Sequence, residues 1–151
     1  MIYLDTSTVL AHLLSEDRRP PAALWDNVLV SSRLIEYETW TRLHRAGLGE
    51  AHIEAARLVM SRLALVELSP VVLARVLEPF PGTASVRTLD ALHLATCDYL
   101  HRRGRSIELA SYDHRMNDAA DAMGIPLFDL SDALTHPGPA LVEVLTDPLL
   151  V

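Results

Sequence analysis

The feature that most constrains this chain is the regular alternation of short apolar runs with longer segments of helical pattern. Because helical segments separate the runs, consecutive strands need helical crossover connections and not tight hairpins. Such crossovers make the strands parallel and cover both faces of the sheet with helices. The sequence therefore predicts an α/β fold, a three-layer α/β/α domain with a mostly parallel central sheet of about five strands. The expected strands are residues 2–5, 28–31, 65–68, 107–111 and 126–128.

Proline and glycine residues mark where the intervening helices begin and end. Pro70 suits the first turn of a helix, because proline has no N–H group to leave unbonded there. Thr88 is expected to be the N-cap of a long helix that Gly104 stops, and Gly124 ends the last helix. The expected helices are residues 6–14, a short segment after Pro20-Pro21, 32–46, 50–63, a segment from Pro70, 88–103 and 113–123.

Length and composition indicate one domain without a membrane segment. The 151 residues suffice for one hydrophobic core, and we expect a single domain over residues 1–135. Residues 136–151 contain three prolines, and we expect a C-terminal tail that is either a packed arm or partly disordered. No apolar run approaches the roughly 20 residues needed to cross a bilayer. The N-terminus has no leading basic cluster, so we expect a cytoplasmic protein that does not associate with membranes.

The formal net charge of −7 weighs against nucleic-acid binding by bulk electrostatics. The 13 basic residues are all arginine, however, and the planar guanidinium group grips phosphate oxygens better than an ammonium group does. Divalent ions bound to clustered carboxylates would also neutralise part of the negative charge. The charge therefore lowers the case for a nucleic-acid function without excluding it. The arginines that we consider for phosphate binding are Arg18, Arg19, Arg42, Arg45 and the group Arg102, Arg103 and Arg105, each by itself an ordinary surface charge.

Three acidic residues stand where a parallel sheet would bring them together. Asp5 ends the first apolar run, and Asp113 follows the run at residues 107–111. Asp90 falls in the first turn of the helix expected at residues 88–103, whose start can face the same edge. Ligands bind outside the carboxyl ends of the strands in open parallel sheets. Each acid alone is explained by helix capping or by the helix dipole, but the joint pattern predicts a shared site.

A fourth acid is expected from the helix that begins near Ser32. Glu36 and Glu38 are both candidates, because helical phase does not separate their faces. For Glu38 the ordinary alternative is a surface ion pair with Arg42, four residues later. Clustered carboxylates repel one another unless a counter-ion is bound. An all-acid cluster without cysteine or paired histidine favours Mg²⁺ or Mn²⁺ over Zn²⁺ as that ion.

Two other classes of protein place an acid at the end of the first strand, and both fit poorly. A phosphoacceptor receiver domain also needs a lysine near its last strand, and this chain contains no lysine. A haloacid-dehalogenase-like phosphatase begins with Asp-x-Asp, whereas the residue two after Asp5 is Ser7 here.

The acids and their neighbours together resemble the PIN-domain family, in particular the VapC-type ribonuclease toxins of bacterial toxin–antitoxin pairs. The resemblance covers nearly the whole chain in the right order, and the ordered set is more specific than any one piece. The four pieces are Leu4-Asp5-Thr6-Ser7, the helix start from Ser31-Ser32 to Glu38, Leu89-Asp90-Ala91-Leu92-His93-Leu94-Ala95-Thr96, and Ser111-Tyr112-Asp113 before a helix ending in Gly124-Ile125-Pro126.

The resemblance implies roles for individual residues. The second acid of the family usually comes six residues after a serine at the helix start, and counting from Ser32 selects Glu38. Ser7 and Ser111 match hydroxyl groups that support the site, and Asp118 is close enough to share or replace the role of the last acid. The residues that the resemblance implies as catalytic and metal-binding are Asp5, Glu38, Asp90 and Asp113.

By this resemblance the chain is expected to have a PIN-like fold and to hydrolyse RNA phosphodiesters with Mg²⁺, or Mn²⁺, as the toxin of a type II toxin–antitoxin pair. The expected partners are a cognate antitoxin protein and a second copy of the chain, as a homodimer or a hetero-oligomer with the antitoxin. The alternatives are a PIN-like module that binds RNA or a partner without turnover, and a housekeeping PIN nuclease with no antitoxin.

The resemblance leaves a histidine and three aromatic residues near these motifs without a role. His93 comes one turn after Asp90, and we expect its side chain to pack against the sheet as an ordinary polar residue. The alternatives are that His93 orients a carboxylate or contacts RNA. Trp25, Trp40 and Tyr37 are expected in the core or at a dimer surface.

Overall fold

Four short strands form one parallel sheet in the residues that the computed structural model describes, which are 1–14, 17–82 and 85–131. The strands are β1 (Ile2–Leu4), β2 (Leu29–Ser32), β3 (Leu63–Val66) and β4 (Glu108–Ala110). The helices are α1 (Thr6–Leu13), the short 3₁₀ helix η1 (Ala22–Asp26), α2 (Leu34–Arg45), α3 (Gly49–Ser61), α4 (Pro70–Val76), α5 (Thr88–Arg102) and α6 (His114–Ala122). None of these helices, in the described ranges, has the length and apolar character needed to cross a membrane. The tail predicted at residues 136–151 lies outside the described residues.

The strand order β3-β2-β1-β4 places the first strand of the chain inside the sheet. Ile2 pairs with Leu29 on one side and with Glu108 on the other, and all the strand pairs are parallel. The chain moves outward from β1 through β2 to β3, and then returns to the other side of β1 for β4. The order therefore reverses between β1 and β4, and the crevice outside their carboxyl ends is where open parallel sheets bind ligands.

The fifth strand predicted at residues 126–128 is wrong as a strand. Leu127 makes only an isolated parallel bridge to Leu109, at the outer edge of β4. Two backbone bonds of 2.8 Å hold it, from the Leu109 N–H to the Pro126 carbonyl and from the Phe128 N–H to the Leu109 carbonyl. Pro126 has no N–H group and so cannot extend the ladder. The sheet accordingly has four strands within the described part of the chain, slightly fewer than predicted.

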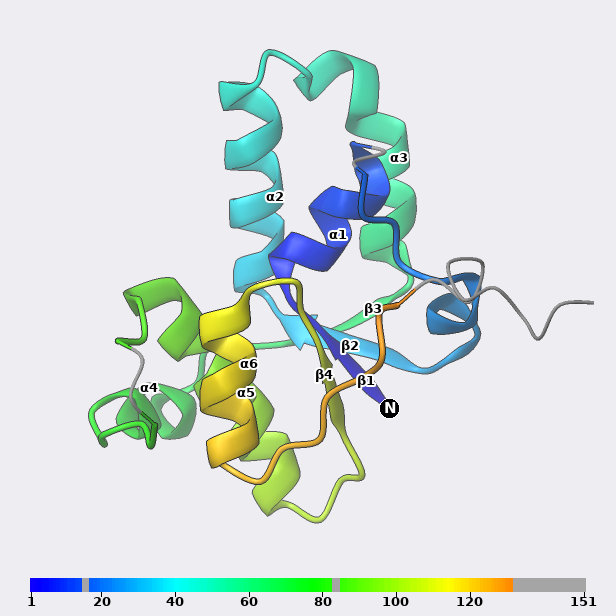
Figure 1. The fold of residues 1–151 in the computed structure, drawn as a ribbon. Coiled ribbons are helices and arrows are strands. Elements are labelled where there is room, and N and C mark those ends of the chain that lie inside the picture. Colours follow the sequence, from blue (N-terminus) through cyan, green and yellow to red (C-terminus); the bar gives the residue numbers. More distant parts are fainter. Residues whose placement is uncertain (15–16, 83–84, 132–151) are drawn as a thin grey trace, which may run out of the picture.

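Alternation along β1 divides the core between the two faces of the sheet. Ile2 and Leu4 belong to a buried cluster with side chains of α1, α2 and α3. Tyr3 points the other way, into a cluster with side chains of α5 and α6. Figure 1 shows α1, α2 and α3 gathered on one side of the strands and α5 and α6 on the other. The predicted three-layer α/β/α arrangement is therefore confirmed.

Two predicted boundaries differ from the structure. The third strand begins and ends two residues before the predicted run at 65–68, because Ser69 already caps α4 by accepting a hydrogen bond from the Val72 N–H. Thr88 is the first residue of α5 and not its N-cap, which is Arg87 in an extended conformation. The shift at α5 matters for the site, because Arg87 then stands immediately before the turn that carries Asp90.

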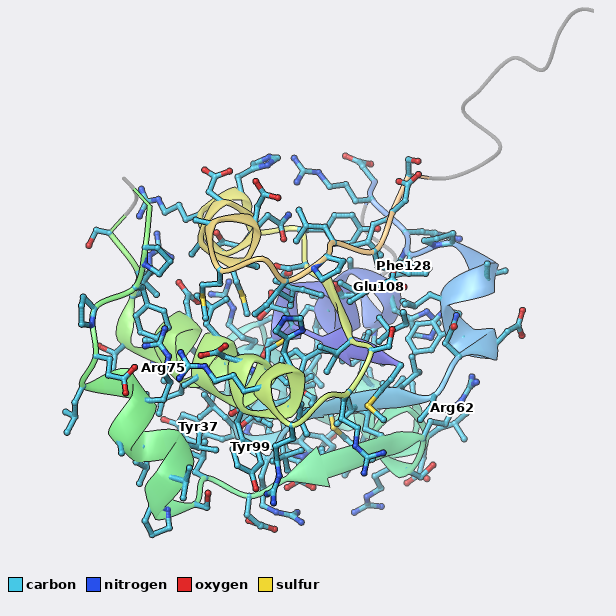
Figure 2. All side chains as sticks on the ribbon, turned by 90° about the horizontal axis from the view of Figure 1, so that it is seen from below. Tyr37, Arg62, Arg75, Tyr99, Glu108 and Phe128 are labelled. Carbon is cyan, nitrogen blue, oxygen red and sulfur yellow. The ribbon has the colours of Figure 1, made fainter. Side chains whose placement is uncertain are left out.

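Helix α4 packs on α5 through a buried ion pair. The Arg75 guanidinium Nε lies 2.7 Å from Asp98 Oδ2, and the two side chains are only 10% and 6% exposed. Arg102, one turn after Asp98 on α5, reaches the same oxygen at 3.0 Å from the surface. Arg75 also lies over the ring of Phe80, 4.4 Å from its centroid. Figure 2 shows Arg75 directed toward α5. This carboxylate is thus fully compensated by two cations.

Candidate active site

One cavity at the carboxyl edge of the sheet brings together four acidic side chains from distant parts of the chain. Asp5 follows β1, Glu38 lies on α2, Asp90 lies in the first turn of α5, and Asp113 precedes α6. All four line the same cavity, whose volume is about 410 Å³. It opens beside β1 and β4, where the strand order reverses.

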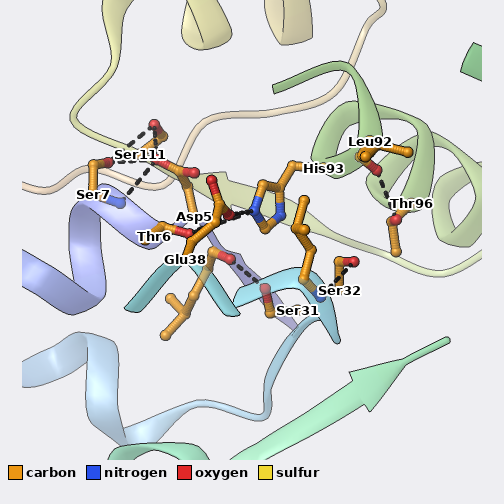
Figure 3. Close-up of polar contacts among 12 residues, drawn as sticks. Asp5, Thr6, Ser7, Ser31, Ser32, Glu38, Leu92, His93, Thr96 and Ser111 are labelled. Atoms are coloured by element: carbon orange, nitrogen blue, oxygen red, sulfur yellow. Dashed lines mark hydrogen bonds and ion pairs between the residues drawn. The ribbon is translucent and has the colours of Figure 1, made fainter. Parts of the chain in front are cut away.

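Asp5 is held by one of its two carboxylate oxygens. Oδ2 accepts hydrogen bonds from the Ser7 N–H (3.1 Å), the Ser7 hydroxyl (2.5 Å) and the Ser111 hydroxyl (2.9 Å), as Figure 3 shows. The backbone bond makes Asp5 the N-cap of α1, so the structural role of a lone aspartate is fulfilled. Within the described residues no donor reaches Oδ1. One oxygen is anchored, and the other remains available to a ligand.

Asp113 shows the same division between its two oxygens. Oδ1 accepts from the N–H groups of Arg115 (2.9 Å) and Met116 (3.2 Å), which makes Asp113 the N-cap of α6. Its own N–H donates to the Ser111 hydroxyl at 3.0 Å, so Ser111 ties Asp113 to Asp5. No described residue donates to Oδ2. Capping therefore uses Oδ1 of Asp113 and leaves Oδ2 without a donor from the described residues.

Thr6 and His93, both buried, hold Glu38 by one carboxylate oxygen. Its Oε2 accepts from the Thr6 hydroxyl at 2.7 Å and lies 2.6 Å from His93 Nε2 (Figure 3). The surface pair with Arg42, the alternative that the sequence left open, is not among the ion pairs of the described residues. Burial favours the neutral carboxyl, but the hydrogen bond and charge of His93, with smaller effects of Thr6 and Arg42, hold the pKa of Glu38 below its ordinary value.

Asp90 is the acid with the fewest partners. It accepts no side-chain or backbone hydrogen bond from the residues that the structure describes. Burial, followed by repulsion from Asp113 and Asp5, raises the pKa of Asp90 above its ordinary value, although Arg87 opposes this. Burial and the two neighbouring carboxylates thus both disfavour the charged form of Asp90.

The donor set fits a hard divalent cation. Asp5, Glu38 and Asp113 each keep one oxygen without a donor, and Asp90 keeps both. Carboxylate oxygens are the ligands that Mg²⁺ and Mn²⁺ prefer. In the described residues no three histidine, cysteine or acidic side chains converge closely enough to form a ready-made metal site.

The structure separates the alternatives that remained open for the second and the last acid. Glu36 pairs with Arg33 at 3.0 Å and does not line the cavity, whereas Glu38 does. Asp118 is exposed on α6 and does not line the cavity either, whereas Asp113 does. The geometry thus brings Glu38 and Asp113 to the other acids and leaves Glu36 and Asp118 outside.

Several residues around the cavity have a place that the sequence did not predict. His93 is completely buried and touches Glu38, so it is more than a polar residue packed against the sheet. Tyr37, expected in the core or at a dimer surface, is 64% exposed and lines the cavity, so it is not a core residue. Trp25 and Trp40 do pack against the core. Thr6 and Tyr3 were missed, because a strand pattern gives the face of a residue but not its hydrogen-bond partner.

Three arginines lie on the wall of the cavity, and only two of them were among the candidates. Arg42, Arg45 and Arg87 all line it, and all are exposed. Arg18 and Arg19 line a different cavity of about 590 Å³, whose wall includes Ser111, the residue that donates to Asp5. The other candidates, Arg102, Arg103 and Arg105, lie at the end of α5 that is opposite to Asp90.

Comparison with known proteins covers the part of the chain that carries these acids. The family model described as the PIN domain matches residues 2–122, a range that contains all four acids. The chain is similar to ribonuclease VapC35 of Mycobacterium tuberculosis, with 31% identity over 130 residues that cover 83% of this chain and 93% of that protein. It is also similar to ribonuclease VapC46 of Mycobacterium tuberculosis, with 34% identity over 130 residues that cover 82% and 93% of the two chains.

Proposed function

The chain belongs to the PIN-domain family, and from this premise we propose that it is a metal-dependent endoribonuclease and the toxin of a type II toxin–antitoxin pair. The observation that carries the proposal is the single cavity lined by Asp5, Glu38, Asp90 and Asp113. Each of these acids presents at least one oxygen to which no described residue donates. Such an arrangement is costly for stability, and a bound cation would offset the cost.

The four acids are proposed as the ligands of one or more Mg²⁺ or Mn²⁺ ions and as the catalytic groups. A bound ion of this kind supplies an activated water and stabilises the charge that develops on a phosphodiester. Ser7 and Ser111 support the site, since both hydroxyls donate to Asp5 Oδ2 and keep its other oxygen turned away from them. We keep Asp118 as a supporting candidate, although it is exposed and outside the cavity.

RNA is the proposed substrate, and the wall of the cavity supports this choice. Arg42, Arg45 and Arg87 place positive charge around the acids, which suits the phosphates that flank a scissile bond. Tyr37 offers an exposed aromatic ring on which a base can stack. The local charge is therefore favourable to RNA even though the net charge of the chain is −7.

The partners follow from the similarity to VapC ribonucleases. We propose a cytoplasmic protein that forms a homodimer and is neutralised by a small antitoxin, within a hetero-oligomer. A short reading frame beside this one, encoding a DNA-binding antitoxin, would support the toxin role. A chain without such a neighbour, whose expression does not arrest growth, would instead be a housekeeping PIN nuclease.

The decisive experiment is an RNA cleavage assay on the purified chain. We expect cleavage with added Mg²⁺ or Mn²⁺, its loss with EDTA, and its loss in Asp5→Asn and Asp90→Asn. Asp121→Asn is the matched control, because it removes the same charge from an exposed position on α6 outside the cavity. Cleavage that persists equally in all variants and in EDTA would show a contaminant. RNA binding without cleavage in the wild type would favour the alternative of a binding module without turnover.

Asp113→Asn and Asp118→Asn form a second matched pair, since the two residues lie five positions apart around the start of α6. We expect the first change to abolish cleavage and the second to leave most of it. The reverse result would make Asp118 the fourth acid.

A further inference from the structure

The Glu38 carboxylate stands at the end of a hydrogen-bonded chain that runs through the interior of the protein. The Ser32 N–H in β2 donates to the Tyr3 hydroxyl at 3.1 Å. The Tyr3 hydroxyl lies 2.8 Å from His93 Nδ1, and His93 Nε2 lies 2.6 Å from Glu38 Oε2. These hydrogen bonds thus connect the backbone of β2 to Glu38 through the side chains of Tyr3 in β1 and His93 in α5.

The directions of these hydrogen bonds follow from the chemistry of the groups. An ionised carboxylate only accepts, so His93 Nε2 must carry the hydrogen that faces Glu38. In the neutral ring Nδ1 is then an acceptor and the Tyr3 hydroxyl donates to it, whereas in the charged ring Nδ1 donates to the Tyr3 oxygen; in both forms Nε2 donates to Glu38. The Tyr3 oxygen accepts in turn from the Ser32 N–H. Every donor along the chain meets an acceptor, which buried polar networks require.

Tyr3 and His93 are both completely buried, and neither lines the cavity. Their rings meet edge to face, with centroids 5.9 Å apart and an interplanar angle of 82°. Packing on both sides of this contact fixes the ring of His93, and with it the position of Nε2. A group held in this way can orient a carboxylate but cannot touch RNA.

Thr6 and His93 both donate a hydrogen bond to the same oxygen of Glu38. Thr6 donates to Oε2 at 2.7 Å, so Oε2 has two donors while Oε1 has none among the described residues. We propose that Tyr3 and His93 are positioning residues that hold Glu38 by Oε2 and thereby present Oε1 to the cavity. The positioning role rests on the hydrogen bonds alone. That Oε1 would bind a divalent cation rests on the proposed function.

Groups that orient a metal ligand from behind typically change metal affinity by about 10–100-fold when they are lost. His93→Leu removes the donor at similar volume, His93→Gln keeps an amide N–H near the place of Nε2, and Tyr3→Phe removes only the hydroxyl. The control is Thr39→Val, because Thr39 is a buried residue of α2 next to Glu38 whose hydroxyl has no partner in the described residues.

Two measurements test the proposal, and neither needs RNA cleavage. In metal-free crystal structures we expect the Glu38 carboxylate to move in His93→Leu and Tyr3→Phe and to stay in place in His93→Gln and Thr39→Val. By calorimetric titration with Mn²⁺ we expect affinity to fall about tenfold or more in His93→Leu, less in Tyr3→Phe, and to recover at least partly in His93→Gln. In turnover assays kcat should fall while KM for RNA stays unchanged, because neither residue reaches the cavity wall.

A folded His93→Leu protein whose Glu38 stays in place and whose Mn²⁺ affinity is unchanged would overturn the positioning role. If His93→Leu does not fold, Tyr3→Phe decides in the same way, since it keeps the ring. A wild type that neither binds Mn²⁺ nor cleaves RNA would refute the proposed function instead. The movement of Glu38 in the variants would then still support the positioning role.

Discussion

The buried carboxylate of Asp98 and the carboxylates of the cavity have opposite kinds of partner. Asp98 on α5 is 6% exposed at its side chain and lies between Arg75 and Arg102, which both contact the same oxygen. The acids of the cavity have no arginine within ion-pair distance among the described residues. Burial, followed by repulsion from Asp113 and Asp5, raises the pKa of Asp90. The first arrangement joins two helices. The second leaves Asp5, Asp90 and Asp113 without a cationic partner among the described residues, which supports the proposed cation site.

The comparison teaches that burial of an acid alone does not reveal a functional site. Asp5 and Asp98 are buried to a similar extent, at 6% and 4% exposure. What distinguishes them is the chemistry of their partners, since hydroxyl and N–H groups hold Asp5 in place without cancelling its charge. The predictions below test whether this distinction controls stability and activity.

The largest effect is expected for Asp98→Asn. Removing the charge leaves Arg75 without its buried carboxylate partner and with only the exposed Glu78 at 3.7 Å. Breaking a buried pair costs about 3–5 kcal/mol of unfolding free energy. Urea denaturation would measure the loss. Mn²⁺ affinity of the folded fraction should stay unchanged, since Asp98 does not line the cavity. A stable Asp98→Asn protein would show that the ion pair does not join α4 to α5.

Asp90→Asn is expected to have opposite effects on activity and on stability. RNA cleavage should fall by about 10²–10³-fold, a typical cost of losing one group that stabilises a transition state. Unfolding free energy in EDTA should rise or stay equal, because the change removes a carboxylate that Asp113 and Asp5 repel. Turnover and urea denaturation of the same sample would check both. A strongly destabilised Asp90→Asn would contradict the idea that this acid is uncompensated.

Mn²⁺ should stabilise the wild type against unfolding, because it binds the assembled cavity and not the unfolded chain. At a free concentration of about 100 times Kd the gain is about 2.7 kcal/mol. Thermal denaturation with and without Mn²⁺ would show it as a rise in Tm. Asp121→Asn should keep the full rise and Asp5→Asn should lose most of it. Equal shifts in both variants would place the ion elsewhere on the surface.

The smallest effects are expected in how the unfolding free energy without metal depends on pH. As the pH rises, the contribution of Asp90 should fall and that of Glu38 should increase. The folded state raises the pKa of Asp90, so it binds more protons than the unfolded state and loses stability as the pH rises through this range. The folded state lowers the pKa of Glu38, so the stability from this group is present above its ordinary pKa and is lost as the pH falls.

Urea denaturation in EDTA between about pH 3 and pH 7 would separate the two contributions, given the ordinary pKa values of carboxyl groups. Relative to wild type, Asp90→Asn should gain stability toward higher pH and Glu38→Gln should lose it. The same slope in both variants would mean that His93 does not distinguish Glu38 from the other acids.

The sequence by itself determined the class of fold and singled out candidate acids, which the structure brings to one cavity. Period-two and helical patterns follow directly from which side chains must leave water, so the α/β class and most elements could be predicted from them. Asp5, Asp90 and Asp113 could be singled out because the end of a parallel strand and the start of a helix lie at a known edge of the sheet. The prediction of a fifth strand was wrong, because the hydrophobic pattern does not show which backbone N–H groups are present. Pro126 has no N–H group to donate to a neighbouring strand.

Only the tertiary structure decided which partners hold those acids. Helical phase left Glu36 and Glu38 equivalent, and the family resemblance selected Glu38. Only packing shows that Glu38 lies on His93 and Thr6, residues of two other helices. The contact between Tyr3 and His93 joins positions 90 residues apart. Long-range hydrogen bonds of this kind depend on the relative placement of elements in space, which local sequence periodicity does not encode. The sequence thus supplied the chemical groups, and the fold decided which of them remain uncompensated.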